Sequence, residues 1–317
     1  MRFLIVGPGA MGCLFSARLK KAGFDVTLLD YDRERAMLIN DQGVIVEGIL
    51  GEYKVKVPTT AGSPETIPDL VMICVKSYKT REAGESVKSI IGQDTKVLTL
   101  QNGIGNIEIL EEVHGRENVL GGVTAEGATL LGPGKIRHAG QGDTIIGPSG
   151  GPESVVERAV LALNKAGFKS RPEENVQSLI WGKLIINVGI NALTAITGLK
   201  NGRLPEFPGT KHVLAEAVRE AVAVAEAKGI ELPYSEPVDR VVGVCQATSG
   251  NIASMLQDVL KRRMTEIEAI NGAVVREGEN AGIPTPVNQT LTNLVQTIQE
   301  SYTKAFQCRT PEWFALD

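Results

Sequence analysis

The sequence is poor in the residues that build metal centres and disulfide frameworks. Its 317 residues include only 4 cysteines and 3 histidines. The cysteines stand singly, with no CxxC pair, so neither a zinc site nor a disulfide framework is predicted. They are Cys13, Cys74, Cys245 and Cys308. This usage is typical of a reducing compartment, and a cytoplasmic location is expected.

Long basic runs and long apolar runs are absent as well. The net charge is −4 and the basic residues are scattered, which argues against nucleic acid or an anionic membrane as a partner and leaves small anionic ligands open. Gly7-Pro8-Gly9 interrupts the first apolar run too early for a signal peptide. No stretch reaches the roughly 18 consecutive apolar residues of a membrane span.

The length and the order of patterns predict two domains. At 317 residues the chain exceeds the roughly 250–300 residues at which one core stops growing. Strand, turn and helix patterns alternate up to residue 171, and residues 172–317 read as helical almost throughout. We therefore expect an α/β fold, with an N-terminal Rossmann-type doubly wound sheet over 1–171 and a C-terminal all-helical domain over 172–317.

Three local expectations complete this outline. Residues 44–57 alternate between apolar and polar types and predict an exposed hairpin. The glycines around residues 132–142 mark two short strands that are expected to form a hairpin closing the sheet. Residues 251–279 read as one helix with Asn251, Ser254, Asp258 and Glu266 as inward polar candidates.

A glycine motif follows the first predicted strand directly. Residues 2–6 read as a buried strand, the helical pattern begins after Gly12, and a second strand is predicted at 25–29. In this context the first glycine allows a tight turn, the second lets a pyrophosphate approach the backbone, and the third lets helix and strand pack closely. A dinucleotide site is predicted at Gly7, Pro8, Gly9, Ala10, Met11 and Gly12.

Polar residues follow the next predicted strands at the edge where ligands bind in such sheets. Asp30 and Arg33 follow the second strand: an acid there would bind the ribose 2′-hydroxyl of NAD, and an arginine would bind the 2′-phosphate of NADP, so both cofactors stay open. Lys76 follows the strand at 69–75, and Asn102 follows the strand at 95–100. Both are candidate cofactor contacts, with a solvated lysine and a turn asparagine as the alternatives.

An apolar helix at 181–196 carries a polar stripe. Lys183, Asn187 and Asn191 are spaced by four residues and so share one face. An unpaired buried amide would cost about 1–3 kcal/mol, so the stripe needs partners. An internal network would satisfy it, but a polar ligand is the interpretation we favour.

Together these segments resemble the ketopantoate reductase family. The resemblance runs from Gly7 to about Asn280. The segments that carry it are GPGAMG at 7–12, VK at 75–76, QNGIGN at 101–106, WGKLIINVGINALTAI at 181–196, NG at 201–202 and NIASMLQDVLKRRMTEIEAINGAV at 251–274. It implies a Rossmann domain, a helical domain and an active site in the cleft between them.

The resemblance also implies roles for individual residues. Lys183 matches the proton-donating lysine, and Glu266 matches a glutamate beside the cofactor and that lysine. The substrate would be bound by Asn187, Asn191, Asn201 and Ser254, and Lys76, Asn102 and Ala128 match further cofactor positions. Tyr31 stands where the family usually carries the arginine that holds the NADP phosphate, so NADPH and NADH are both candidate cofactors.

The expected activity is reduction of 2-dehydropantoate to pantoate, with a 2-keto acid as the small-molecule substrate. Hydride addition places negative charge on the carbonyl oxygen, so a cation that can donate a proton is needed there. One alternative is an NAD-dependent dehydrogenase of another branched 2-hydroxy acid; a more distant one is a non-catalytic dinucleotide sensor. A homodimer through the helical domain is compatible with the resemblance.

Overall fold

A computed structural model describes residues 1–64, 66–151 and 153–303 of the chain. It divides into two compact units: Met1–Leu184 with Ile230–Pro233, and Ile185–Gly229 with Tyr234–Asp317. The expected combination of a doubly wound sheet and a helical region is confirmed. The division falls inside one helix, whereas the sequence places a domain boundary after residue 171, and that boundary stays a prediction.

The first unit holds all the described strands. They are β1 (Arg2–Val6), β2 (Asp25–Leu29), β3 (Val44–Gly48), β4 (Tyr53–Val55), β5 (Thr59–Thr60), β6 (Leu70–Ile73), β7 (Lys96–Thr99), β8 (Val119–Thr124), β9 (Gly127–Gly132), β10 (Lys135–Gly140), β11 (Asp143–Pro148) and β12 (Lys169–Pro172). Its α-helices are α1 (Ala10–Lys21), α2 (Arg33–Gln42), α3 (Thr80–Val87), α4 (Asn106–His114) and α5 (Glu153–Lys165), and its 3₁₀ turns are η1 (Ser77–Lys79), η2 (Lys88–Ile90) and η3 (Arg116–Asn118).

Within the described ranges, the main sheet has eight strands in the order β12-β11-β8-β7-β6-β1-β2-β5. β1 pairs in parallel with β2 on one side and with β6 on the other, so the strand order reverses there. β7 and β8 continue the parallel arrangement. The carboxyl ends of β1, β2, β6, β7 and β8 therefore lie at one edge, and crevices at such a reversal are the usual ligand site in doubly wound sheets.

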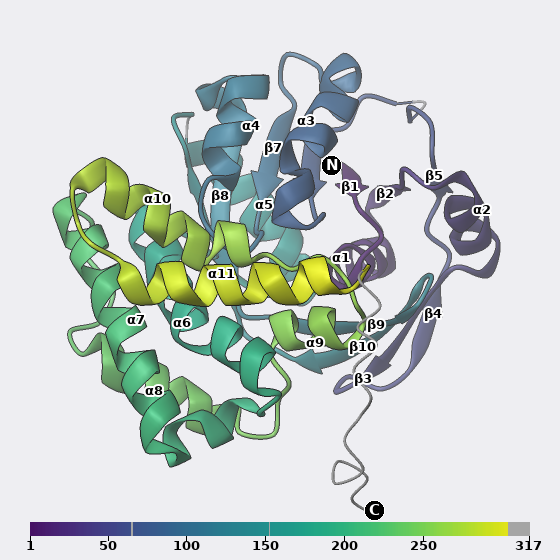
Figure 1. Ribbon diagram of the computed structural model, residues 1–317. Coiled ribbons are helices and arrows are strands. Elements are labelled where there is room, and N and C mark those ends of the chain that lie inside the picture. The colour runs from purple at the N-terminus through teal and green to yellow at the C-terminus, as the bar shows by residue number, and fades with distance from the viewer. Residues whose placement is uncertain (65, 152, 304–317) are drawn as a thin grey trace, which may run out of the picture. The chain divides into compact units, whose positions relative to one another are not determined.

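Both faces of this sheet are covered by helices because its strands are apolar on both sides. Phe3 and Ile5 face a core shared with α1 and α5, whereas Leu4 and Val6 face a core shared with α3 and α4. Figure 1 shows these helices on the two sides of the strands. The alternation within one five-residue strand thus fixes which helix covers which face.

A second sheet corrects two expectations. Residues 44–55 do form an antiparallel hairpin, but it is not exposed, since Val44 and Val46 are 0% and 1% exposed. β3 pairs with β10, giving the order β4-β3-β10-β9, and α1 packs against this sheet. The β9–β10 hairpin therefore belongs to this second sheet and does not close the main sheet. In the main sheet, the strand that follows β8 on the side away from β7 is the antiparallel β11. Alternation cannot show which sheet a short strand joins.

Three cysteines of the described chain are free thiols. Cys13 and Cys74 lie below the glycine turn, and burial raises the pKa of each to about 12. Cys245 is buried in the helical unit, where burial raises its pKa to about 11. These side chains act as apolar packing groups. Cys308 lies outside the described residues.

The remaining elements are helical. They are α6 (Val176–Thr197), η4 (Asn201–Glu206), α7 (Pro208–Ala227), α8 (Pro237–Ala247), α9 (Ser254–Leu260), η5 (Ile267–Ala269), α10 (Asn271–Ala281) and α11 (Pro286–Ser301). Among the described residues, α6 is the one helix long and apolar enough to cross a membrane, and 67% of its apolar 18-residue stretch is buried inside the protein. Core helices pass the same test, so this is weak support for a span.

The single helix expected over 251–279 is wrong. α9 ends at Leu260, and Arg262 adopts a left-handed backbone with a φ of 49°. The amide of Arg263 donates to the carbonyl of Asp258, which turns the chain, and the next α-helix begins only at Asn271. No glycine or proline marks this break in the sequence. Ser254 and Glu266 therefore do not share a helix.

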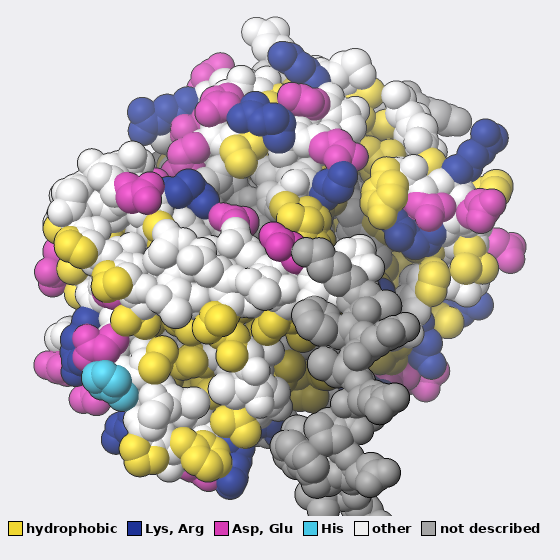
Figure 2. Space-filling model, viewed as in Figure 1, with side chains coloured by type: hydrophobic (Ala, Val, Ile, Leu, Met, Phe, Trp, Pro, Cys, Tyr) yellow, Lys and Arg dark blue, Asp and Glu magenta, His cyan; other side chains and the backbone are white. Residues whose placement is uncertain are grey.

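Charges of both signs are interspersed over α3 and α4 on the face drawn in Figure 2. One pair joins the two helices, because Arg81 forms an ion pair with Glu112. Such mixing gives no field of one sign over these helices.

Candidate active site

The glycine turn between β1 and α1 has the geometry of a dinucleotide loop. Gly7 has a φ of +102° and its amide donates to the Leu29 carbonyl at 2.9 Å. A side chain at Gly12 would place its Cβ 1.9 Å from the Gly7 carbonyl oxygen. At the α1 N-cap residue Gly9, no side chain of the described residues caps the helix, so the first-turn amides of Ala10 and Met11 have no capping side chain there. Unpaired amides at a helix N-terminus bind phosphate, and the residues present therefore fit a dinucleotide.

The end of β2 is more constrained than its sequence suggests. Asp30 is 3% exposed, and both its carboxylate oxygens accept from the Arg35 guanidinium, with Nε at 2.6 Å from Oδ2. This hydrogen bonding raises the pKa of Arg35. Asp32 caps α2 by accepting from the Arg35 amide at 3.0 Å, and Arg33 is exposed. Sequence reasoning missed Arg35, since its spacing from Asp30 carries no motif.

A hydrogen-bonded bridge joins the ends of β6 and β7. The Gln101 amide nitrogen donates to the Val75 carbonyl at 2.8 Å and to the Thr80 hydroxyl at 2.9 Å. The Asn106 side-chain amide donates to the backbone carbonyl of Asn102 at 3.1 Å, so this hydrogen bond does not use the Asn102 side chain. Lys76 directly precedes η1 at the same edge. The bridge fixes the loop that carries Asn102, a role that sequence reasoning did not assign to Gln101 or Thr80.

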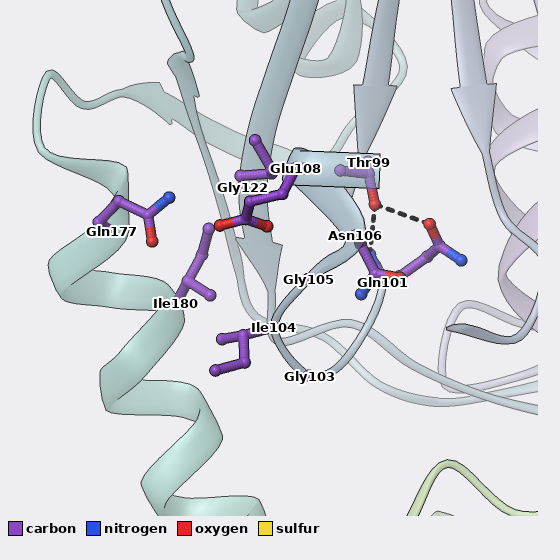
Figure 3. A pocket seen from close by; sticks show the side chains of 11 residues that line it. Thr99, Gln101, Gly103, Ile104, Gly105, Asn106, Glu108, Gly122, Gln177 and Ile180 are labelled. Atoms are coloured by element: carbon purple, nitrogen blue, oxygen red, sulfur yellow. Dashed lines mark hydrogen bonds between the residues drawn. The ribbon is translucent and has the colours of Figure 1, made fainter. Parts of the chain in front are cut away.

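A pocket lies beside this loop, with about 290 Å³ of space that includes open solvent. Figure 3 shows Ile104 and Ile180 on its apolar side, with the Thr99–Gln101 hydrogen bond, at 2.9 Å, beside the loop. Glu108 and Gln177 contribute polar groups. The lining belongs to the first unit.

Lys183 lies at the same sheet edge. Its Nζ donates to the Thr124 carbonyl at 2.8 Å, and Thr124 is the last residue of β8. The lysine is half-buried. Sequence reasoning missed Thr124, because a backbone carbonyl can accept a hydrogen bond in a residue of any type.

Ala128, the predicted cofactor contact on β9, lies opposite His138 on β10.

The predicted substrate amides lie in the second unit. Asn191 is 6% exposed, and Asn187 has a buried Nδ2 with no hydrogen-bond partner among the described residues. Asn201 donates to the Thr248 hydroxyl at 2.9 Å, while its buried Oδ1 has no such partner. These unpaired atoms favour a ligand over a complete internal network.

Ser254 and Glu266 differ in their surroundings. Ser254 is exposed at the first turn of α9, and Glu266 is 7% exposed in the segment before η5. Their roles as carboxylate contact and as partner of the lysine stay predictions.

The fold and these residues define a dinucleotide-binding oxidoreductase. The sheet carries a glycine turn that fits a pyrophosphate, and a lysine on an apolar helix reaches the same edge.

Comparison with models of known protein families assigns the chain to a particular family. Residues 3–151 match the model for ketopantoate reductase PanE/ApbA, and residues 175–299 match the model for its C-terminal part. The chain belongs to the ketopantoate reductase family, and the resemblance seen in the sequence is confirmed.

Individual relatives agree with this assignment. The chain is 37% identical over 302 residues to 2-dehydropantoate 2-reductase of Halobacterium salinarum, covering 94% of this chain and 99% of the relative. The match to the Pyrococcus horikoshii enzyme of the same name is also 37%, over 298 residues, covering 93% and 97%.

Solved structures agree as well. A ketopantoate reductase from Ralstonia eutropha superposes with a TM-score of 0.88 at 32% identity, covering 95% of this chain and 99% of that one. D-mandelate dehydrogenase with NADH and anilino(oxo)acetate superposes with a TM-score of 0.89 at 29% identity, with the same coverage.

Proposed function

We propose that this protein is a 2-dehydropantoate 2-reductase that uses NADH or NADPH and Lys183 as its proton donor. The observation that carries the proposal is the Lys183 ammonium, which projects from an apolar helix and donates to the Thr124 carbonyl at 2.8 Å. The Thr124 carbonyl ends a strand at the ligand edge of the sheet. A dinucleotide bound at the glycine turn would lie at the same edge of the sheet, which supports a role for this ammonium near the cofactor.

The chain's own residues would perform the remaining steps. When bound, a reduced nicotinamide supplies the hydride for the substrate carbonyl carbon. Lys183 would donate a proton to the carbonyl oxygen as negative charge develops there, so that the keto group becomes a hydroxyl. Asn187 and Asn201 each have a buried polar atom without a hydrogen-bond partner in the described part of the chain, which suits them to bind the substrate's hydroxyl and carboxylate. Asn191, Ser254 and Glu266 are proposed to complete the set.

The dinucleotide would be held chiefly by backbone groups. Residues 7–12 would bind the pyrophosphate, with Asp30 or Arg33 at the ribose and Lys76, Asn102 and Ala128 towards the nicotinamide. The carboxylate of Asp30 at the end of β2 favours substantial use of NADH.

A second candidate is an NAD-dependent dehydrogenase of another branched 2-hydroxy acid. Two observations favour it: Tyr31 is 81% exposed beside the buried Asp30, and D-mandelate dehydrogenase with NADH superposes on 95% of this chain. A dinucleotide sensor without catalysis is less well supported, because it would have no use for a positioned ammonium.

Steady-state turnover separates these functions. The purified protein is given 2-dehydropantoate, a phenyl-substituted 2-keto acid and a straight-chain 2-keto acid, each with NADH and with NADPH. The highest kcat/KM for 2-dehydropantoate supports the proposal. A higher value for another 2-keto acid supports the second candidate, and dinucleotide binding without turnover supports the sensor.

We further propose a cytoplasmic enzyme whose partner is a small molecule and neither nucleic acid nor a membrane. A homodimer through the helical unit is proposed as its assembly. Light scattering of the purified chain would contradict the dimer by giving the mass of one chain.

A further inference from the structure

Three ionisable side chains meet in the interior of the first unit. The side chains of Arg18, Glu126 and His138 are 7%, 0% and 1% exposed. Glu126 Oε2 lies 2.6 Å from His138 Nε2 and 3.8 Å from Arg18 Nη1. The carboxylate is thus held between an imidazole and a guanidinium, away from water.

Arg18 ties this cluster to the helix of the glycine turn. It lies on α1, its Nε donates to the Ala166 carbonyl at 3.1 Å, and its guanidinium carbon is 4.0 Å from the centre of the Phe168 ring. These contacts fix the guanidinium from two further directions. The position of Glu126 is therefore coupled to α1, the helix that the dinucleotide loop leads into.

Glu126 is also tied to the acceptor of Lys183. Its backbone amide donates to the Thr124 hydroxyl at 3.2 Å, and that hydroxyl pairs with the Thr144 hydroxyl at 2.8 Å. The carbonyl of the same threonine accepts from Lys183. The buried carboxylate thus lies two residues from the group that holds the ammonium.

Stability alone does not account for such a cluster. Removing charged groups from water costs several kcal/mol for each ion, and well-packed apolar residues of similar volume are often as stable. The cluster also leaves Arg18 Nη1, Glu126 Oε1 and His138 Nδ1 buried with no hydrogen-bond partner among the described residues, which adds to the cost. What charged contacts do supply is a defined direction for each group.

We propose that Glu126, held by His138 and Arg18, is a positioning residue that sets the Thr124 carbonyl, and with it the Lys183 ammonium, in register with the dinucleotide loop. The inference rests on the proposed role of Lys183. Hydride transfer and proton donation act on adjacent atoms of one carbonyl, so lysine and dinucleotide must be aligned, and a displacement of about 1 Å can lower a rate about a hundredfold.

Glu126→Gln tests the inference because it keeps the shape and removes the charge. We expect kcat to fall by about ten- to a hundredfold, while the KM of the 2-keto acid and the Kd of the dinucleotide stay unchanged. His138→Gln should have the same effect and serves if the first variant does not fold. The double variant should lose no more than either single one, because the residues act as a unit. Glu126→Asp, which keeps the charge, should recover part of the loss.

Thr95→Val is the matched control. Thr95 is 2% exposed in the same unit, and its hydroxyl donates to the Pro68 carbonyl at 2.6 Å, before the first residue of β7 and remote from the ligand edge. It should lower the melting temperature and leave kcat normal. If Glu126→Gln behaves like this control, the cluster is structural and the inference is overturned.

Crystal structures of the wild type and of Glu126→Gln give a readout that needs no turnover. We expect the variant to lose the contact between Lys183 Nζ and the Thr124 carbonyl. If the wild type reduces no 2-keto acid but the variant loses this contact, the proposed function fails and the positioning role stands. If the wild type is active and the variant keeps both contact and kcat, the positioning role alone fails.

Discussion

The glycine turn at 7–12 and the polar stripe of α6 handle polar ligands in opposite ways. The turn offers backbone groups: Gly7 adopts a φ of +102°, and Gly9 begins the helix without a capping side chain from any described residue. The stripe offers side chains: the Lys183 ammonium donates to the Thr124 carbonyl, and Asn187 has a buried Nδ2 without a partner among the described residues.

This difference teaches which changes each region tolerates. A site built from backbone amides depends on the space around them, so any added atom disturbs binding. Binding at such a site does not depend on the functional group of a side chain. A side-chain site depends on one functional group, and an isosteric change is enough to remove it. Binding of the dinucleotide and chemistry on the substrate should therefore be separable by mutation.

The largest expected effect is on the chemistry. Lys183→Ala should lower kcat about 10²- to 10⁴-fold, the usual loss when a general acid is removed. The Kd of the dinucleotide should stay unchanged, because the lysine acts on the substrate carbonyl. Single-turnover reduction and titration of dinucleotide fluorescence measure the two quantities. Near-normal turnover in this variant would remove Lys183 from the mechanism.

The second effect is on the turn, where two glycines should respond differently. Among the described residues, a Cβ at Gly9 would have one non-neighbouring atom within 4 Å, the Cys74 carbonyl oxygen at 3.8 Å, whereas at Gly12 it would lie 1.9 Å from the Gly7 carbonyl oxygen. Overpacking costs about 1–3 kcal/mol. Gly12→Ala should therefore lower the melting temperature, and Gly9→Ala should keep it while weakening dinucleotide binding by about tenfold or more.

Thermal melts and fluorescence titrations of both variants test this contrast. Tight dinucleotide binding by a stable Gly9→Ala protein would mean that the pyrophosphate does not approach this turn.

The third prediction separates ligand amides from structural amides. Asn187 has a buried Nδ2 without a partner among the described residues, whereas Asn288 donates from its Nδ2 to the Ala217 carbonyl at 3.0 Å and accepts at its Oδ1 from Asn271 at 3.0 Å. Asn187→Ala should raise the KM of the 2-keto acid and leave the stability unchanged. Asn288→Ala should lower the free energy of unfolding by about 1–3 kcal/mol without changing KM. Equal behaviour in urea melts and kinetics would refute the distinction.

Sequence patterns predicted the first unit well where the signals are local. The strand at 2–6, the turn at Gly7 and the helix after it are contiguous, and each follows from a few neighbouring residues. The break at Arg262 was missed, because no glycine or proline marks it and an apolar pattern continues across it. The partner of β3 was missed because pairing depends on distant residues.

Outside the glycine turn, the candidate site was predictable only through its side chains. Lys183 and Asn187 stand out because they interrupt an apolar helix. Thr124, by contrast, acts through its carbonyl, and Arg35 acts through an ion pair with Asp30. A backbone acceptor and an ion pair of this kind can be identified only in the folded structure.

The smallest expected effect concerns the choice of dinucleotide. Asp30 accepts from Nε and Nη2 of Arg35 with its two carboxylate oxygens, so fewer donors of this guanidinium can reach a 2′-phosphate, and the carboxylate itself repels a phosphate. Both effects favour NADH. Asp30→Asn weakens the ion pair and removes the repulsion. Partly exposed charge pairs contribute up to about 1 kcal/mol, so the Kd ratio should shift towards NADPH by about fivefold.

Arg33→Ala completes the test. Arg33 is exposed, and if it were the phosphate ligand, its loss would weaken NADPH binding and leave NADH binding unchanged. If Asp30 sets the preference for NADH, the affinities for NADH and NADPH should both stay nearly constant in this variant, because the Arg33 guanidinium would contact neither dinucleotide. Wild-type binding of NADPH more than about tenfold tighter than NADH, abolished in Arg33→Ala, would contradict the role of Asp30 and make Arg33 the residue that selects NADPH.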